Sequence, residues 1–122
     1  MRLTVVGCSG SFAGPDSPAS CYLVTAEHEG RTWRLVIDLG NGALGALQRH
    51  TALADLDAIV LSHLHPDHCI DVTGLYVTRT YDPTGQQSQR LPVYGPTGTA
   101  ERLAAAYEGM DEGGMERVLD FR

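Results

Sequence analysis

Three histidines and one aspartate crowd into residues 63–68, which run His63-Leu64-His65-Pro66-Asp67-His68. The chain has five histidines in 122 residues, so an even spread would put about a quarter of one histidine in any six-residue window. Imidazole and carboxylate groups together suit Zn²⁺ and are also accepted by Mn²⁺ and Fe²⁺. This segment is therefore the strongest candidate for a metal site.

The spacing within the segment predicts which ligands share an ion. In an extended chain, residues two apart point to one side with their Cα atoms about 6.6 Å apart, so His63 and His65 can close on one ion. Asp67 lies further along that side and can serve a second ion together with His68, which faces differently. Pro66 favours this arrangement because it holds the preceding residue in the extended region. Two ions about 3.5–4 Å apart would hold a bridging hydroxide, which suits hydrolysis of a phosphodiester or an acyl bond.

Plainer interpretations stand beside this one. The segment could be a polar loop that caps a helix, and His28 and His50, which lie outside it, are typical surface histidines. Asp38 could simply cap the turn that follows it. Cys69 adjoins the cluster, but a small buried side chain fits it better than a ligand.

Strands and helices alternate along the chain, and they must position the cluster. The patterns predict a strand over 3–6, a loop rich in Gly, Ser and Pro over 8–20, and a hairpin of strands over 21–25 and 32–38. A helix is expected over 43–50, followed by an apolar run over 58–61 of the kind that is buried on both faces of a sheet. The cluster comes directly after this run, at the carboxyl edge where α/β proteins bind ligands.

The second half continues the alternation. We expect a helix over 70–77 with Gly74 inside it, a loop over 82–90, a strand over 91–94 and a helix to about residue 107 that Thr97 caps. A segment rich in Gly and acids spans 109–114, and residues 115–121 begin another element. The fold class is α/β in a single domain.

Composition narrows the partners and the compartment. Nine basic residues, all of them Arg, face fifteen acidic ones, and the resulting charge of −6 does not favour nucleic acid as a partner. The three cysteines form no C-x-x-C pair and no disulfide framework, which indicates a reducing, cytoplasmic setting. No apolar stretch is long enough for a membrane span, so no membrane partner is expected.

Several motifs of this sequence resemble those of a known family. Residues 61–68 carry the H-x-H-x-D-H motif of the metallo-β-lactamase superfamily, and Val36-Ile37-Asp38-Leu39-Gly40 is similar to its preceding strand, which ends in Asp-x-Gly. Residues 3–11 and 93–99 resemble the ribonuclease Z-like and cyclic-nucleotide phosphodiesterase branch. The resemblance runs from residue 3 to about residue 103 and implies the N-terminal half of an αβ/βα sandwich.

The resemblance also implies roles for individual residues. His63 and His65 would bind the first metal, and Asp67 and His68 the second. Asp67 would also act in catalysis by holding the hydroxide in line, while Asp38 would support the site without binding metal. The implied cofactors are two divalent ions, with zinc expected and manganese or iron as alternatives.

The resemblance is incomplete, because the family's third motif His, its bridging Asp and its final His lie downstream of the first cluster. No histidine follows His68 in this sequence. Residues 1–122 are therefore expected to be one partial domain, truncated before those ligands and inactive by itself. Half a sandwich exposes an apolar sheet face, so the chain should dimerise, swap, or pair with the missing half.

Three functions follow as expectations. The first is a metal-dependent phosphodiesterase acting on a small cyclic nucleotide or, less favoured by the acidic charge, on an RNA 3′ end. The second is a hydrolase of thioesters, lactones or β-lactams on the same scaffold. The third is a metal-binding chain that never turns over substrate, because four ligands on one short loop leave two ions under-coordinated.

Overall fold

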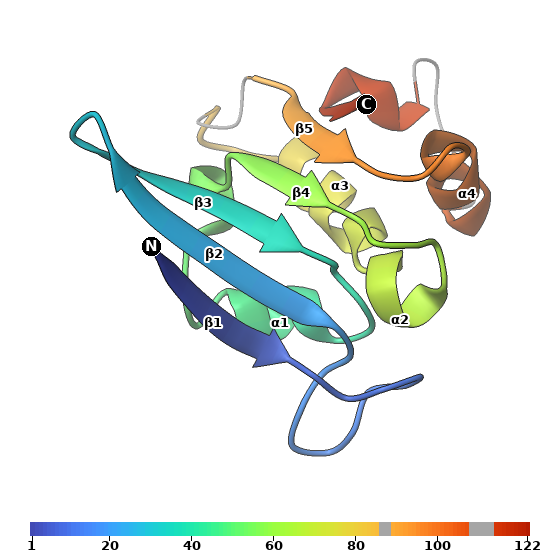
Figure 1. Cartoon of the computed structure of the whole chain (residues 1–122). Helices are drawn as coiled ribbons and strands as arrows, with labels where there is room; N and C mark the ends of the chain where they lie inside the picture. Colours follow the sequence, from blue (N-terminus) through green and yellow to red (C-terminus); the bar gives the residue numbers. More distant parts are fainter. Residues whose placement is uncertain (86–88, 108–113) are drawn as a thin grey trace.

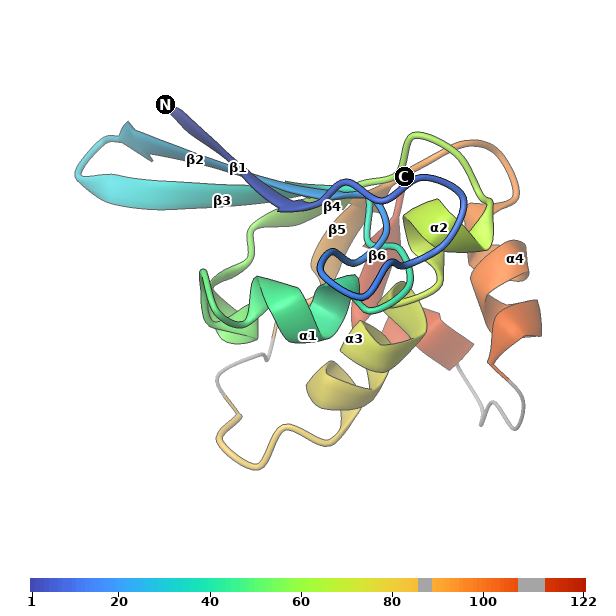
Figure 2. The same cartoon turned by 90° about the horizontal axis from the view of Figure 1, so that it is seen from below.

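The computed structural model describes residues 1–85, 89–107 and 114–122, which form one six-stranded sheet with helices on one side. The strands are β1 (Arg2–Gly7), β2 (Cys21–His28), β3 (Arg31–Ile37), β4 (Ala58–Val60), β5 (Leu91–Tyr94) and β6 (Leu119–Phe121). Figure 1 labels the first five of them, and β6 is labelled in Figure 2. The strands lie side by side in chain order. The first three pair antiparallel, whereas β3, β4, β5 and β6 run parallel.

The helical elements are short. They are α1 (Ala43–Leu47), α2 (Pro66–Cys69), α3 (Val72–Thr80) and α4 (Thr99–Ala106), with single 3₁₀ turns η1 (Leu53–Asp55) and η2 (Gly114–Arg117). Viewed along the sheet, α1, α3 and α4 all lie on the same side of it (Figure 2). Among the described residues, no helix is both long and apolar enough to cross a lipid bilayer.

The core fills the space between the sheet and these helices. Alternate side chains of each strand point into it, because successive residues of a strand face opposite sides. Fully buried examples from the sheet are Val36, Ile59, Val93 and Leu119, and from the helices Leu47, Leu75 and Leu103. The expected α/β fold is confirmed, with most predicted elements in place and the hairpin strand over 21–25 extended to His28.

The second face of the sheet has no described helix over it, and this corrects one expectation. The run over 58–61 was predicted to be buried on both faces, yet only Ile59 and Leu61 are buried, while Ala58 and Val60 remain partly exposed. Large apolar side chains on the open face include Leu3, Val5, Trp33 and Tyr94, with exposed fractions of 62%, 54%, 44% and 41%. The strands are therefore apolar on both sides but covered on one.

Two further predictions need correction or fall outside the description. The helix expected after Thr97 begins at Thr99, and its N-cap is Gly98 with a φ of 88°, so no side chain caps it. The acidic, Gly-rich segment over 109–114 and the middle of the loop over 82–90 lie largely outside the described residues. Residues 115–121 form η2 and β6 as the last predicted element.

Candidate metal centre

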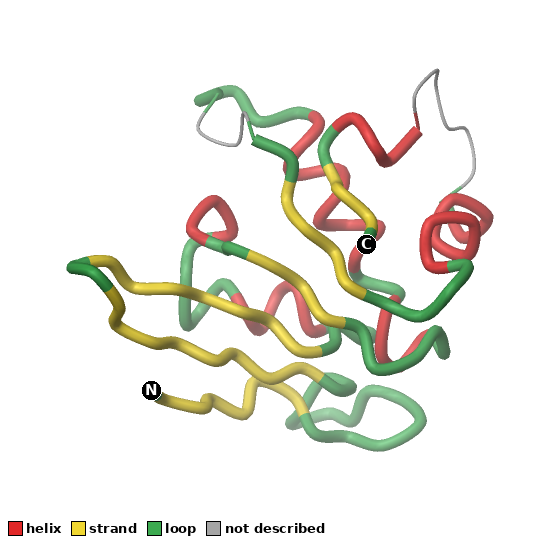
Figure 3. The backbone as a smooth tube through the Cα atoms, turned by 45° about the horizontal axis from the view of Figure 1, so that its top comes forward, coloured by secondary structure: helices red, strands yellow, loops and turns green. Residues whose placement is uncertain are grey.

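The loops at the carboxyl ends of the parallel strands gather at one end of the sheet. The segment after β4, the loop after β3 and the base of the β1–β2 loop lie together there (Figure 3). Backbone hydrogen bonds join all three: Asp38 donates its N–H to Val60, and Ser20 donates its N–H to the carbonyl of Asp67, at 2.8 and 3.1 Å. The predicted metal-binding segment occupies this end.

The segment is extended only in its first half. His65 has φ −70° and ψ 149°, and it serves as the N-cap of α2, which starts at Pro66. Proline suits the first helical position because its missing N–H would have no partner there. The expectation that Asp67 continues along an extended chain is therefore wrong, since the helical turn brings Asp67 and His68 back towards His63.

This turn creates a compact group of metal-ligating side chains. His63, Asp67 and His68 each offer one ligand atom, and these atoms all lie within 4.8 Å of one another. The rings of His63 and His68 are 3.8 Å apart between centroids, and Nε2 of His68 is 3.1 Å from the Asp67 carboxylate. All three residues are partly buried. Together they supply two imidazoles and one carboxylate, which are donor groups usual for zinc.

His65 stands next to the group but outside it. Its ring meets the ring of His63 edge-on, with centroids 4.9 Å apart and planes at 79°. The structure thus brings three of the four predicted ligands together and places the fourth beside them.

Asp38 is buried behind the group and orients His68. Its carboxylate accepts hydrogen bonds from Nδ1 of His68 at 2.7 Å, from the Ser62 N–H at 2.8 Å, and from the hydroxyls of Ser62 and Ser20 at 2.9 and 3.1 Å. Burial by itself would raise the pKa of Asp38, but these donors outweigh it and hold that pKa below its ordinary value. An ionised Asp38 keeps the proton of His68 on Nδ1, which leaves Nε2 facing the ligand group as an electron-pair donor.

The backbone conformation around Asp38 allows its side chain to reach His68. Asp38 has a φ of 59°, in the left-handed region that Asp tolerates better than most residues. The next residue, Leu39, donates its N–H to the carbonyl of His68 at 2.7 Å and accepts from the N–H of Asp71 at 3.0 Å. At Gly40, a Cβ would overlap the Asp67 carbonyl, so only glycine allows the two loops to approach this closely.

Several supporting residues were not found from the sequence. The hydroxyls of Ser20 and Ser62 complete the Asp38 network, and nothing in their spacing distinguishes them from other loop serines. Asp71 accepts the Leu44 N–H at 2.9 Å at the start of α1. Burial raises the pKa of Asp71 although backbone N–H groups oppose the change. Arg102 of α4 donates from Nε to the Leu64 carbonyl at 3.4 Å, between the first two histidines.

The remaining candidates behave as the plainer interpretations expected. Cys69 is buried, with 1% of its surface exposed, and does not belong to the ligand group. His28 and His50 are exposed and lie outside that group.

Comparisons with known proteins place these features in a family context. A family model described as a β-lactamase superfamily domain matches residues 33–118. An uncharacterized protein of Mycobacterium tuberculosis is 55% identical over 106 residues, covering 87% of this chain and 37% of that protein. The ribonuclease Z of Mycolicibacterium paratuberculosis is 31% identical over 111 residues, covering 90% of this chain and 38% of the enzyme.

A solved structure agrees with these matches. The metallo-β-lactamase fold protein YhfI of Bacillus subtilis superimposes with a TM-score of 0.73 at 31% identity, over 82% of this chain and 39% of YhfI. In a sequence comparison, this chain is 32% identical to the probable metallo-hydrolase YhfI of Bacillus subtilis. The match covers 84% of this chain and 41% of YhfI. The chain thus spans about two fifths of the length of the relatives that it matches.

Proposed function

Because this chain belongs to the metallo-β-lactamase superfamily, we propose that it carries the first half of the metal centre of a hydrolase that cleaves phosphodiester bonds. In this proposal, residues 1–122 are the N-terminal half of one domain, and a longer polypeptide supplies the remaining ligands. The observation that carries the proposal is the convergence of His63, Asp67 and His68 within 4.8 Å.

In this proposal two divalent ions share the ligands. His63 and His65 would hold the first ion, and Asp67 and His68 would hold the second. When bound, such ions supply Lewis acidity and lower the pKa of water towards neutrality. Zinc fits the nitrogen and oxygen donors best, and manganese and iron are the alternatives.

The protein's own groups then position the reaction. The Asp67 carboxylate accepts a hydrogen bond from the attacking water and keeps it in line with the leaving group. Asp38, which never touches the substrate, fixes the ring of His68 through Nδ1. Ser62 holds Asp38 from two sides, through its N–H and its hydroxyl.

A phosphodiester is favoured over an acyl substrate because of the similarity to a ribonuclease Z. The charge of −6 favours a small cyclic nucleotide over a long RNA, since polyanion binding uses a basic surface. The three cysteines are all free, which supports a reducing compartment such as the cytoplasm.

Elemental analysis of protein prepared without chelator tests the metal centre. We expect bound zinc, manganese or iron, and a loss of that metal in His63→Ala and in Asp67→Ala. His50→Ala removes an exposed histidine and serves as the matched control, with metal content unchanged. Absence of metal from the parent protein would contradict the metal centre.

A substrate panel tests the reaction. The proposal expects metal-dependent turnover of cyclic AMP or a bis-aryl phosphate once the missing ligands are supplied by the longer protein. Turnover of a thioester, a lactone or a β-lactam alone would assign the scaffold to the second class of hydrolase. Metal binding without turnover of any substrate would identify a binding module.

A further inference from the structure

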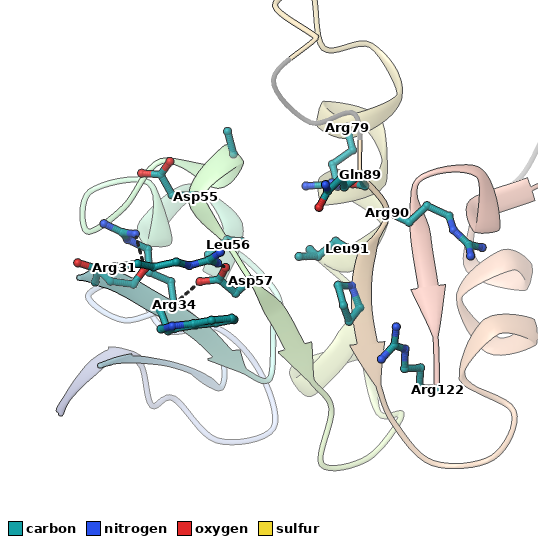
Figure 4. A pocket seen from close by; sticks show the side chains of 14 residues that line it. Arg31, Arg34, Asp55, Leu56, Asp57, Arg79, Gln89, Arg90, Leu91 and Arg122 are labelled. Atoms are coloured by element: carbon teal, nitrogen blue, oxygen red, sulfur yellow. Dashed lines mark hydrogen bonds and ion pairs between the residues drawn. The ribbon is translucent and has the colours of Figure 1, made fainter. Parts of the chain in front are cut away.

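A cavity lies at the opposite end of the sheet from the candidate metal centre. It has a volume of about 850 Å³ and opens where β3, β4 and β5 begin (Figure 4). β4 separates the two sites, since Asp57 precedes the strand at the cavity and Ser62 follows it at the metal centre. We call this cavity the arginine notch.

The notch exists because β4 is shorter than its neighbour. Leu35 pairs with Ala58, the first residue of β4, so the preceding residues of β3 from Arg31 onwards extend beyond its start. Strands two places apart in a sheet are about 10 Å apart, so the walls formed by β3 and by the start of β5 leave a gap between them. Figure 4 shows Arg31 and Arg34 on one wall, and Arg79, Gln89 and Leu91 on the other.

The lining of the notch is basic, in contrast to the rest of the molecule. Five of the nine basic residues of the chain line it, against two of the fifteen acidic ones. These residues are Arg31, Arg34, Arg79, Arg90 and Arg122, with Asp55 and Asp57. A chain with an overall charge of −6 thus gathers most of its positive charge in one cavity.

Some of these arginines already have acidic partners. Arg31 pairs with Asp57 and stacks on Trp33, with its guanidinium carbon 3.9 Å from the ring centroid. Arg122 pairs with Asp120 at 2.6 Å, and the same carboxylate is 3.8 Å from Arg90. Three of the notch arginines thus share two carboxylates.

Arg34 is arranged differently. Its guanidinium donates to the carbonyl of Thr32 at 3.2 Å, and within the described part of the chain no carboxylate lies at ion-pair distance from it. Arg79 is 6% exposed and donates to the backbone carbonyls of Val118 and Gln89, and the charge of Asp82 also acts on it. Arg79 is therefore held in place as part of the notch wall, whereas Arg34 keeps donors available.

We propose that the arginine notch binds a small phosphate-bearing molecule, with Arg34 as the residue that contacts the phosphate. A guanidinium offers paired N–H donors that match phosphate oxygens, and Arg34 has donors that the Thr32 carbonyl does not use. The net acidity of the chain restricts the ligand to a small molecule, because a long polyanion would meet repulsion outside the notch.

Trp33 makes the proposal directly testable, because it lines the notch and is the only tryptophan in the chain. Titration with inorganic phosphate, pyrophosphate and AMP, followed through the indole N–H resonance at constant ionic strength, should give saturable shifts. Arg34→Gln should weaken binding about tenfold or more, which is the loss expected for one charge-assisted hydrogen bond. Arg49→Gln removes an exposed arginine that does not line the notch and should leave binding within about twofold.

The outcomes distinguish a phosphate ester from a free phosphate anion as the ligand. They also distinguish the arginine notch from the metal centre. Tighter binding of AMP than of the inorganic ions would identify a phosphate ester, and equal binding would identify the free anion. His63→Ala should leave the Trp33 shifts unchanged, so failure of the metal centre does not affect this test. No saturable shift up to roughly 10 mM of any probe, or an equal loss in Arg49→Gln, would overturn the proposal.

Discussion

The carboxylate of Asp38 lies 2.7 Å from Nδ1 of His68, on the far side of the imidazole from the ligand group. Three further donors from Ser20 and Ser62 hold that carboxylate, so it cannot turn away from the ring. The orientation of His68, a proposed metal ligand, therefore depends on Asp38, which lies outside the group of proposed ligands.

Asp38→Asn keeps the size of the side chain but removes its charge. We expect metal affinity to fall about 10- to 100-fold, the usual effect of removing a partner that orients a metal-binding histidine. Competition with a fluorescent chelator measures this change. Asp16→Asn, at an exposed aspartate, is the charge-matched control and should behave like the parent protein. Unchanged affinity in Asp38→Asn would show that His68 does not need this partner.

Gly40→Ala tests the close approach of the two loops. The added methyl group would overlap the Asp67 carbonyl, so we expect a loss of about 3 kcal/mol in the free energy of unfolding and a loss of bound metal. Gly45→Ala is the matched control, because a Cβ there has open space inside α1. That variant should gain up to about 1 kcal/mol in chemical denaturation. Equal stability of the two variants would be incompatible with the packing described.

Thiol reactivity should separate the three cysteines. Cys8 is exposed, whereas Cys21 and Cys69 are buried. Burial, together with the charges of Asp38 and Asp71, raises the pKa of Cys21 from 9.0 to about 12. Because alkylation requires an accessible thiolate, iodoacetamide at pH 8 should modify Cys8 alone, as read by mass spectrometry of the intact protein.

The same pKa predicts how stability varies in alkali. Folding keeps the Cys21 thiol protonated, so its contribution is fully present below pH 9.0 and is lost as the pH rises towards about 12. Cys21→Ala should therefore unfold with a shallower dependence on pH in this window than the parent protein. Parallel curves for both proteins would assign the alkaline loss to other groups.

The open sheet face should drive association. Leu3 and Val5 expose 62% and 54% of their surfaces on β1, and such a face is expected to pair with a second copy when no other sheet covers it. Sedimentation should reveal species heavier than the 13.1 kDa monomer, and Leu3→Thr with Val5→Thr should shift them towards the monomer. Phe12→Ser removes an even more exposed apolar side chain from a loop and should change nothing. A monomer at all concentrations would contradict this expectation.

The sequence was informative where one local pattern determines the structure. Strand 91–94 was predicted with its exact ends, and the cluster over 63–68 was placed correctly after a buried strand. The internal geometry of the cluster was predicted wrongly, because the prediction assumed an extended chain whereas a helical turn begins at Pro66. Proline is compatible with both conformations, and hydrogen bonds from the Ser20 and Leu39 N–H groups to the carbonyls of Asp67 and His68 stabilise the turn.

Features that depend on contacts between distant residues could not be predicted from local sequence patterns. Ser20 and Ser62 meet at Asp38 from positions 18 and 24 residues away, and their roles depend on the pairing of β2, β3 and β4. The arginine notch also requires the register of β3 against β4. In the sequence its five arginines are scattered from Arg31 to Arg122.

The spatial order of the strands follows their order in the chain from β1 to β6, which affects how the molecule can form. Every strand meets its partner as soon as the next one is synthesised, so a chain emerging from the ribosome can extend the sheet one strand at a time. The β1–β2–β3 meander needs nothing from later residues to close its ladders. Asp38 directly follows that meander, so it is synthesised before His68, whose ring it orients.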